Sequence, residues 1–248
     1  MRAGSVVVQT ASVWATRRVC LHENLGYTEG MAEIPSSLLR FFDKEEHALG
    51  FLNGEIRFGL LDVYRTIEGS RRDETEGRVS FSWNKKATEI LIGEESNQII
   101  AVRESDQNIH CSSSSMNRYY IMCTSHPDAN VKYLAEKFGP FMVRIDDPLS
   151  LLERVKREWQ SNGLAQKDGA RIAQVEYNKD GLLEPDPYLT VPVHYSYSQK
   201  PTSDEQDGEF RYVLTCKVDV NRTWEEFLTV RVDDCSDICS LSQIPKTA

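Results

Sequence analysis

A strand–helix–strand pattern between Leu38 and Gly77 constrains the fold more than any other part of the sequence. The run SSLLRFF is apolar and predicts a short buried strand. The following segment, DKEEHALGFLNG, predicts a helix with Asp43 as its N-cap, acidic residues in the first turn and Gly54 as the stop signal. Its expected apolar face consists of Ala48, Leu49, Phe51 and Leu52.

A second strand and a charged loop follow this helix. The segment EIRFGLLDVYR predicts the strand, and the run from Arg65 to Glu76 is dense in charged residues. The loop has two interpretations that the sequence leaves open. It is either a solvated surface turn or a functional loop on a rigid scaffold, where functional residues are over-represented.

The rest of the chain predicts many short strands and few helices. Strands are expected at 78–83, at two short segments around 93–97, at 118–124, at 141–145, over ARIAQVEYN, at 208–218 and over LTVRVDD, with a polar turn at Ser112–Ser115. Helices are expected over ANVKYLAEKFG, ending at Gly139, and over LSLLERVKREWQSNG, capped by Asp146-Asp147-Pro148, with Leu149, Leu152, Val155 and Trp159 on its apolar face. This pattern predicts an α+β fold with mixed or antiparallel sheets and about three flanking helices.

The chain length allows one large domain or two small ones. It has 248 residues, and we expect a single α+β domain over residues 31–248. Residues 1–30 differ in character, being poor in acidic residues at their start, and are expected to be a flexible arm or an over-extended start before Met31. A signal or transit peptide is a third interpretation, although this segment has no continuous apolar core.

The net charge limits the kinds of binding partner that we expect, and the cysteine content bears on metal sites and on the redox environment. The net charge of −9 argues against a surface that binds nucleic acid everywhere, but not against a local basic groove. No run approaches the roughly 18 apolar residues of a membrane span. Of six cysteines, only Cys235 and Cys239 are close in sequence, and no second pair complements them, so we expect no zinc site. Free thiols favour a reducing cytoplasm.

Common catalytic motifs are absent from the sequence. It contains no GxxxxGK[ST], GxGxxG, HExxH or GxSxG pattern, and the histidines are scattered singly. An acidic segment, Ser203–Arg211, leads into a predicted strand. An acidic residue at the start of a strand can face a cleft and stabilise positive charge that develops during a reaction. The simpler interpretation of this segment is an acidic turn on the surface.

Two pieces of sequence carry a resemblance to a known group of proteins. They are FLNGEIRFGLLDVYR…RRDETEG and EFRYVL. Weaker similarity to the same group is found in the segments FGPFMVRIDDP and DDCSDICSL. Together they resemble small bacterial proteins with an ADP-ribosyltransferase-like fold, including uncharacterised families of similar length and toxins that modify DNA. The resemblance runs from about Ser37 to Leu241.

The resemblance implies an enzyme that transfers ADP-ribose from NAD to a macromolecule, as a bacterial toxin or antiphage effector. The implied roles are Glu209 for stabilising the oxocarbenium-like ribose, Tyr64 for stacking on nicotinamide, and Arg40, with Arg57 in reserve, for holding the phosphates or ribose. Residues on the acceptor side would be Arg65, Arg71, Arg72 and Glu76. The chain departs from the group in having Asp at position 207, so no E-x-E pair is present. Its first-strand residue is Arg, where the toxins that modify DNA use other residues.

Three hypotheses of function follow. An enzyme predicts that Arg40, Tyr64 and Glu209 converge on one cleft. A non-catalytic module that binds a nucleotide or a phage protein as a sensor predicts that these residues are dispersed, or that Glu209 is held in a salt bridge with Arg211 or another cation. A metal-dependent nuclease would use Asp73, Glu74 and Glu76. The acceptor and any antitoxin or defence-system partner stay open, and no membrane partner is expected.

Overall fold

The protein is described by a computed structural model. The described residues are 33–65, 118–177, 197–217 and 223–245, together with seven strands elsewhere: β1 (Val6–Val8), β4 (Arg78–Asn84), β5 (Leu91–Ile92), β6 (Gln98–Glu104), β7 (Asn108–Ser115), β11 (Leu182–Leu183) and β12 (Thr190–Val191). The structural findings below concern these residues.

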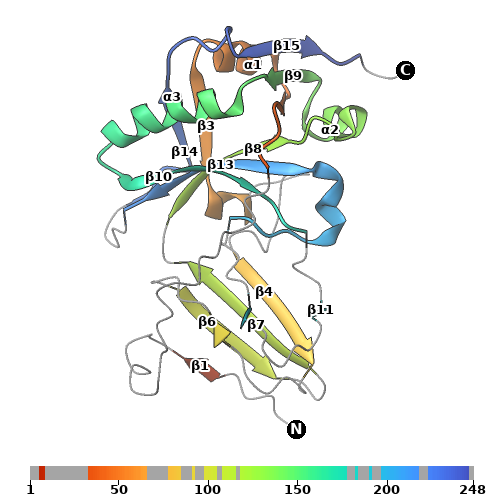
Figure 1. Ribbon diagram of the computed structural model, residues 1–248, viewed down its shortest axis with the longest axis vertical. Helices are drawn as coiled ribbons and strands as arrows, with labels where there is room; N and C mark the ends of the chain where they lie inside the picture. Colours follow the sequence, from red (N-terminus) through yellow and green to blue (C-terminus); the bar gives the residue numbers. More distant parts are fainter. Residues whose placement is uncertain are drawn as a thin grey trace.

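An eight-stranded antiparallel sheet forms the main body of the described chain (Figure 1). Six strands follow the order β10-β13-β8-β2-β9-β15, while β3 pairs with β8 and β14 pairs with β3. Their bounds are β2 Leu38–Phe42, β3 Glu55–Leu60, β8 Tyr119–Ser125, β9 Phe141–Ile145, β10 Ala165–Gln174, β13 Glu209–Cys216, β14 Phe227–Arg231 and β15 Cys239–Gln243. The expected α+β class with a mostly antiparallel sheet is confirmed.

Three α-helices and two 3₁₀-helices accompany this sheet in the described residues. They are α1 (Glu45–Leu52), α2 (Val131–Phe138), α3 (Pro148–Ser161), η1 (Leu61–Arg65) and η2 (Thr202–Asp207). Separate from the main sheet, a five-stranded sheet has the order β1-β6-β7-β4-β11, and β5 pairs with β12. The predicted turn at Ser112–Ser115 is wrong, because these four serines pair with β6 as part of β7.

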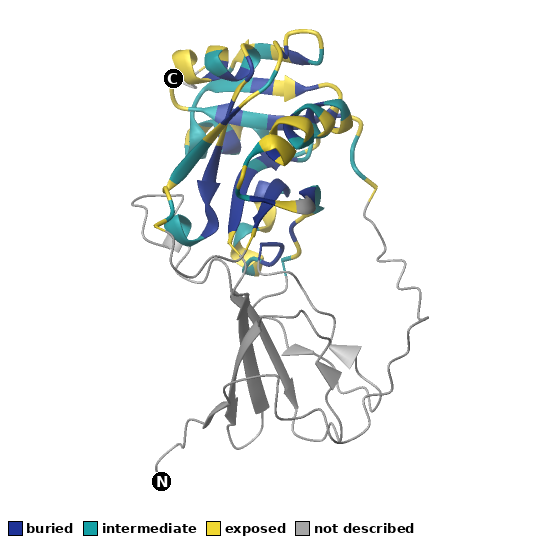
Figure 2. Cartoon of the chain, turned by 90° about the vertical axis from the view of Figure 1, so that its left-hand side faces the viewer, coloured by how far each residue is buried: buried dark blue, intermediate teal, exposed yellow. Residues whose placement is uncertain are grey.

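The main core lies on the face of the sheet that packs against α1 and α3. Alternate side chains of each strand point to this face. On β2, Leu38 packs into the large cluster that contains Phe51 of α1 and Trp159 of α3. The adjacent residue Leu39 points to the other face and packs against Leu134 of α2. Figure 2 shows that the buried residues are concentrated in the strands between these helices. Helices therefore cover both faces of the sheet.

Several local predictions hold and others fail. Helix α3 begins as predicted, with the Asp147 side chain accepting from Ser150 N and Pro148 in the first turn, and α2 stops at Gly139. However, the N-cap of α1 is Lys44, without a side-chain cap, because the carboxylate of Asp43 bonds to His47 instead. Residues predicted on apolar helix faces, Leu49 and Leu149, are 45% and 54% exposed.

Two element assignments near the chain's functional segments also need correction. The strand expected to run through Tyr64 ends at Leu60, and Tyr64 lies in η1. The expected last strand is followed by a further one, β15, which pairs with β9. The charged loop, including Arg71, Arg72, Asp73, Glu74 and Glu76, lies outside the described residues, so its predicted roles stay predictions.

Candidate functional site

A pocket of about 380 Å³ opens beside β2, α1, β3, η1 and β14. Three of the residues expected to bind a cofactor, Arg40, Arg57 and Tyr64, line it. The remaining lining residues are Phe41, Phe42, Asp43, Glu46, His47, Gly50, Phe51, Glu55, Gly59, Phe227 and Thr229. Ligand pockets in proteins have volumes of about 300–1,000 Å³, so this one can take part or all of a nucleotide.

One wall of the pocket is the antiparallel pair of β3 and β14. Arg57 is opposite Thr229, and Gly59 is opposite Phe227. The guanidinium of Arg57 lies over the ring of Phe227, 3.9 Å from its centroid. Since cation–π stacking of this kind fixes a guanidinium in place, Arg57 is a positioned cation on the pocket wall. Its side chain has no carboxylate or hydrogen-bond partner among the described residues.

Gly59 makes room for the side chain of Tyr64. A Cβ at position 59 would lie 2.8 Å from Tyr64 Oη and 3.0 Å from Cε2, closer than side chains tolerate. The tyrosine therefore rests directly on the backbone of β3. Burial raises the pKa of Tyr64, and the neighbouring Cys123 raises it further, so the hydroxyl stays protonated at neutral pH.

Arg40 lies in the middle of β2, on the face that carries Leu38 and Phe42. Its Nη1 donates to the carbonyl oxygen of Cys123 at 2.7 Å. Its guanidinium carbon is 5.2 Å from the ring centroid of Phe42 and 6.0 Å from that of Phe51. A backbone bond and contacts with two aromatic rings thus help to hold Arg40 in the pocket lining.

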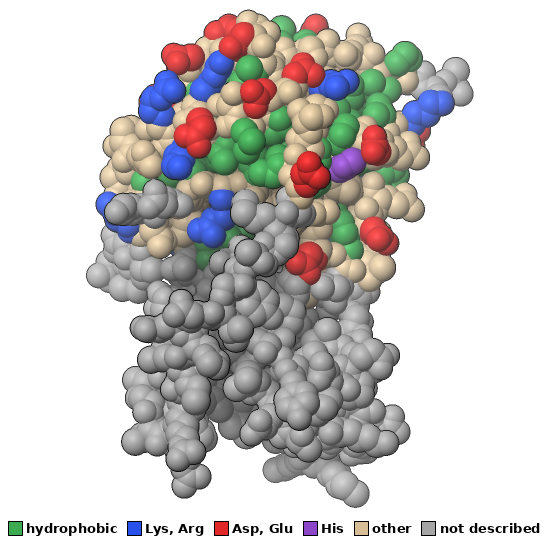
Figure 3. Space-filling view, in the orientation of Figure 1, with side chains coloured by type: hydrophobic (Ala, Val, Ile, Leu, Met, Phe, Trp, Pro, Cys, Tyr) green, Lys and Arg blue, Asp and Glu red, His purple; other side chains and the backbone are tan. Residues whose placement is uncertain are grey.

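Three carboxylates share the pocket with the two arginines. Asp43 Oδ1 is 3.2 Å from His47 Nδ1, and Glu55 Oε1 is 3.2 Å from Arg231 Nη2 on β14. Glu46 is the third. Figure 3 shows acidic and basic side chains interspersed over the described part of one face of the molecule. The pocket lining is thus of mixed charge.

A buried ion-pair network begins at Glu209. Arg211 Nε donates to Glu209 Oε1 at 2.6 Å, and Lys200 Nζ lies 2.8 Å from Glu209 Oε2. Lys200 also lies 4.0 Å from Asp207, whose carboxylate accepts from Lys137 Nζ of α2 at 2.8 Å. Asp207, Glu209 and Arg211 are buried, whereas Ser203, Glu205 and Gln206 are exposed. The interpretation as an acidic surface turn therefore holds for the first part of the segment and fails for Asp207 and Glu209.

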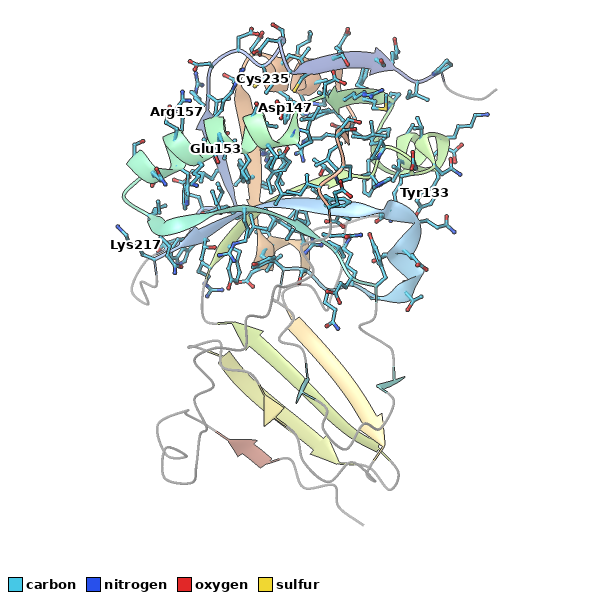
Figure 4. All side chains as sticks on the ribbon, in the orientation of Figure 1. Tyr133, Asp147, Glu153, Arg157, Lys217 and Cys235 are labelled. Atoms are coloured by element: carbon cyan, nitrogen blue, oxygen red, sulfur yellow. The ribbon has the colours of Figure 1, made fainter. Side chains whose placement is uncertain are left out.

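Local backbone geometry brings Asp207 and Glu209 to the same network. Gly208 between them has a left-handed conformation, with φ at +51°, which other residues adopt only at a cost. Tyr133 of α2, labelled in Figure 4, also donates to Asp207, at 3.3 Å. The network therefore ties α2 and the end of η2 to the start of β13.

The charges around Glu209 fix its ionisation. Burial alone would raise its pKa, but Arg211 and Lys200 outweigh burial and hold the pKa well below the ordinary value for glutamate. Burial and the charge of Glu209 raise the pKa of the Cys123 thiol to about 12. A neutral thiol at Cys123 therefore lies near an ionised carboxylate at Glu209.

Cys123 links the three residues named as the implied catalytic and binding set. Arg40 donates to the carbonyl oxygen of Cys123, the charge of Glu209 raises the pKa of the Cys123 thiol, and Cys123 raises the pKa of Tyr64. Arg40 and Tyr64 line the pocket, whereas Glu209 is not part of the lining. Of the expected acceptor-side residues, Arg65 is the last residue of η1.

Sequence reasoning missed five residues that build this region: Gly59, Cys123, Lys200, Asp207 and Phe227. The segment KPTSDEQDGEFR contained a signal, since a lysine and an arginine flank its acidic residues. No comparable signal marks Phe227, because its role depends on β14 pairing with a strand far earlier in the chain.

Other kinds of site are not found in the part of the chain that the structure describes. No group of three His, Cys, Asp or Glu residues there could hold a metal ion. No helix there has the length and apolar character needed to cross a membrane. The described cysteines Cys123, Cys216, Cys235 and Cys239 carry free thiols. In comparisons with known proteins, no family model, no curated protein and no solved structure matches the sequence.

Proposed function

We propose that this protein binds a nucleotide, with NAD as the leading candidate, in the pocket between α1 and the β3–β14 wall. The observation that carries the proposal is Arg57, a guanidinium stacked on Phe227 that faces the pocket without an acidic partner among the described residues. A cation held in this way is suited to a phosphate, because the planar fork of arginine bonds phosphate oxygens in pairs.

The rest of the lining fits the other parts of a nucleotide. Tyr64 and Phe42 supply aromatic surface for a nucleotide base or nicotinamide ring, and Arg40 supplies a second cation in the pocket lining. The ring and the phosphates of one ligand can therefore be contacted together. NAD is preferred among nucleotides because the sequence resembles ADP-ribosyltransferase-like proteins.

Isothermal titration calorimetry with NAD, ADP-ribose and nicotinamide tests the binding proposal. Arg57→Ala should weaken binding of NAD and ADP-ribose by about ten- to hundredfold, since one charge-assisted phosphate contact contributes about 1.5–3 kcal/mol. Arg144→Ala is the matched control, because Arg144 is a half-exposed arginine paired with Asp146 outside the pocket. No binding by the wild-type protein, or equal binding by the Arg57→Ala variant, would overturn the proposal.

Transfer of ADP-ribose is a second candidate function, favoured by the meeting of Arg40, Tyr64 and Glu209 at Cys123. An ionised carboxylate can stabilise a ribose oxocarbenium ion. Against catalysis, Glu209 is ion-paired with Arg211 and Lys200 and is not part of the pocket lining. That arrangement is the one expected of a non-catalytic nucleotide sensor. The enzyme would act as a bacterial toxin or antiphage effector in the cytoplasm, and the sensor as part of a defence system.

Nicotinamide release separates these two candidates. Purified protein is incubated with NAD and cell lysate as the acceptor source, and wild type is compared with Glu209→Gln. Asp207→Asn is the control, because it removes a charge from the same buried network one step further from Cys123. Release by wild type and Asp207→Asn but not by Glu209→Gln supports transfer. Binding without release by the wild-type protein supports the sensor.

A further inference from the structure

We infer that Glu55 makes the pocket selective for nucleotides whose ribose carries free hydroxyl groups, and that it disfavours a phosphorylated ribose. The inference rests on the proposed nucleotide binding and adds to it a specificity-determining residue. Its basis is the position of Glu55 beside Arg57 on the pocket face of β3.

Strand geometry sets the spacing of these two side chains. Glu55 and Arg57 are two residues apart on the same face of β3, which separates them by about 7 Å along the strand. This spacing spans a phosphate and the hydroxyl groups of the ribose attached to it. A phosphate bound at Arg57 therefore places its sugar within reach of the Glu55 carboxylate.

The surroundings of Glu55 keep its carboxylate accessible. The Glu55 side chain is 49% exposed. The residue that faces it on α1 is Gly50, which has no side chain; a Cβ at that position would lie 3.5 Å from Glu55 Oε2. Its ion-pair partner among the described residues, Arg231, has a side chain that is 80% exposed. Exposed pairs of this kind are weak and exchange readily with other partners, so Oε2 and Oε1 can accept hydrogen bonds from a ligand.

The chemistry of a carboxylate gives the direction of selectivity. Ionised carboxylates only accept hydrogen bonds, and a ribose diol offers two donors, as in dinucleotide sites where an acidic residue binds the ribose hydroxyls. A phosphate on that ribose replaces a donor by negative charge, which Glu55 repels. Asp43, just before α1, and Glu46 of α1, the other acids in the lining, add repulsion of the same sign. The basic groups that face them are Arg40, Arg57 and His47 in the lining and Arg231, which pairs with Glu55.

Calorimetric titration with NAD and with NADP, which carries a ribose phosphate, tests the inference. The wild-type protein should bind NAD at least about tenfold more tightly than NADP, because of this repulsion. Glu55→Gln removes the charge and releases Arg231 to meet the phosphate, so its preference should fall to about threefold or less. Arg231→Ala, the matched control, should keep the wild-type preference. Melting temperatures of all variants establish that they are folded.

The outcomes distinguish this inference from the function on which it rests. Equal wild-type affinity for NAD and NADP, or an unchanged preference in Glu55→Gln, overturns the role of Glu55 and leaves nucleotide binding standing. Absence of binding of either dinucleotide overturns the proposed function and the selectivity together. A preference lost in Arg231→Ala but kept in Glu55→Gln assigns the selectivity to Arg231 instead.

Discussion

Arg211 and Glu209 lie two residues apart on β13 and form a buried ion pair, with Arg211 Nε 2.6 Å from Glu209 Oε1. Their side chains are 1% and 5% exposed. The Arg211 Nη1 group also donates to the carbonyl oxygen of Tyr197 at 2.8 Å. The pair thereby connects the segment before η2 to the centre of the main sheet.

Removing Arg211 should be costly for stability. Arg211→Met leaves Glu209 buried with Lys200 as its remaining cationic partner among the described residues, and breaking a buried pair on one side costs about 3–5 kcal/mol. Urea denaturation measures the free energy of unfolding. Arg144→Met, which removes an exposed pair, should cost less than about 1 kcal/mol. Equal losses in the two variants would show that the Arg211 pair contributes nothing beyond a surface pair.

The free energy of unfolding should depend on pH because Glu209 is ionised in the folded protein. Its pKa in the folded protein is well below the value of about 4.3 in an unfolded chain. The stabilisation is therefore fully present above pH 5 and is lost progressively as the pH falls toward the folded-state pKa. The difference in unfolding free energy between wild type and Glu209→Gln should shrink from pH 6 to pH 3. A difference that stays constant over this range would contradict an ionised, ion-paired Glu209.

Enlarging Gly59 should disturb the pocket through Tyr64. In Gly59→Ala the new methyl group would meet Tyr64 Oη at 2.8 Å, so the tyrosine ring must move. We expect NAD affinity to fall by about three- to tenfold as a ring contact of about 0.5–1.5 kcal/mol is lost. Gly163→Ala is the control, since a Cβ there has no atom within 4 Å. Unchanged affinity in Gly59→Ala, measured by calorimetry, would remove Tyr64 from the binding site.

The Cys123 thiol should be unreactive in the folded protein. Its pKa is raised to about 12 by burial and by Glu209, and that of Cys239 is raised to about 12 by burial and Cys235. Because the thiolate is the nucleophile, iodoacetamide at pH 8 should label both only after unfolding in urea. Peptide mass spectrometry gives the extent of labelling at each cysteine. Rapid labelling of Cys123 in the native protein would mean that it is accessible and ionised.

Local sequence signals accounted for much of the fold. The apolar runs over β2, β8, β9 and β13 and the helix signals at Asp147 and Gly139 predicted elements that the structure contains. These signals depend on nearest neighbours along the chain. Strand β15 was missed because its sequence, CSLSQ, alternates weakly and has one large apolar residue at an edge of the sheet.

Long-range pairing explains what could not be predicted about the candidate site. The acidic segment before β13 resembled a solvated turn because its main cation from another element, Lys137, is 70 residues away from Asp207 in the sequence. Tyr64 was placed on a strand because LLDVYR continues the apolar pattern of β3. The position of the Tyr64 ring depends on its contact with Gly59. The spacing of apolar residues along the sequence does not reveal this contact.

The pairing of β14 with β3 has a consequence for the order in which the protein acquires its pocket during synthesis. Residues of β3 emerge from the ribosome long before Phe227–Arg231, their partners. Contacts so distant in sequence form late in folding. A nascent chain that ends before Phe227 lacks the wall on which Arg57 stacks, so this side of the pocket is completed only when translation has passed β14.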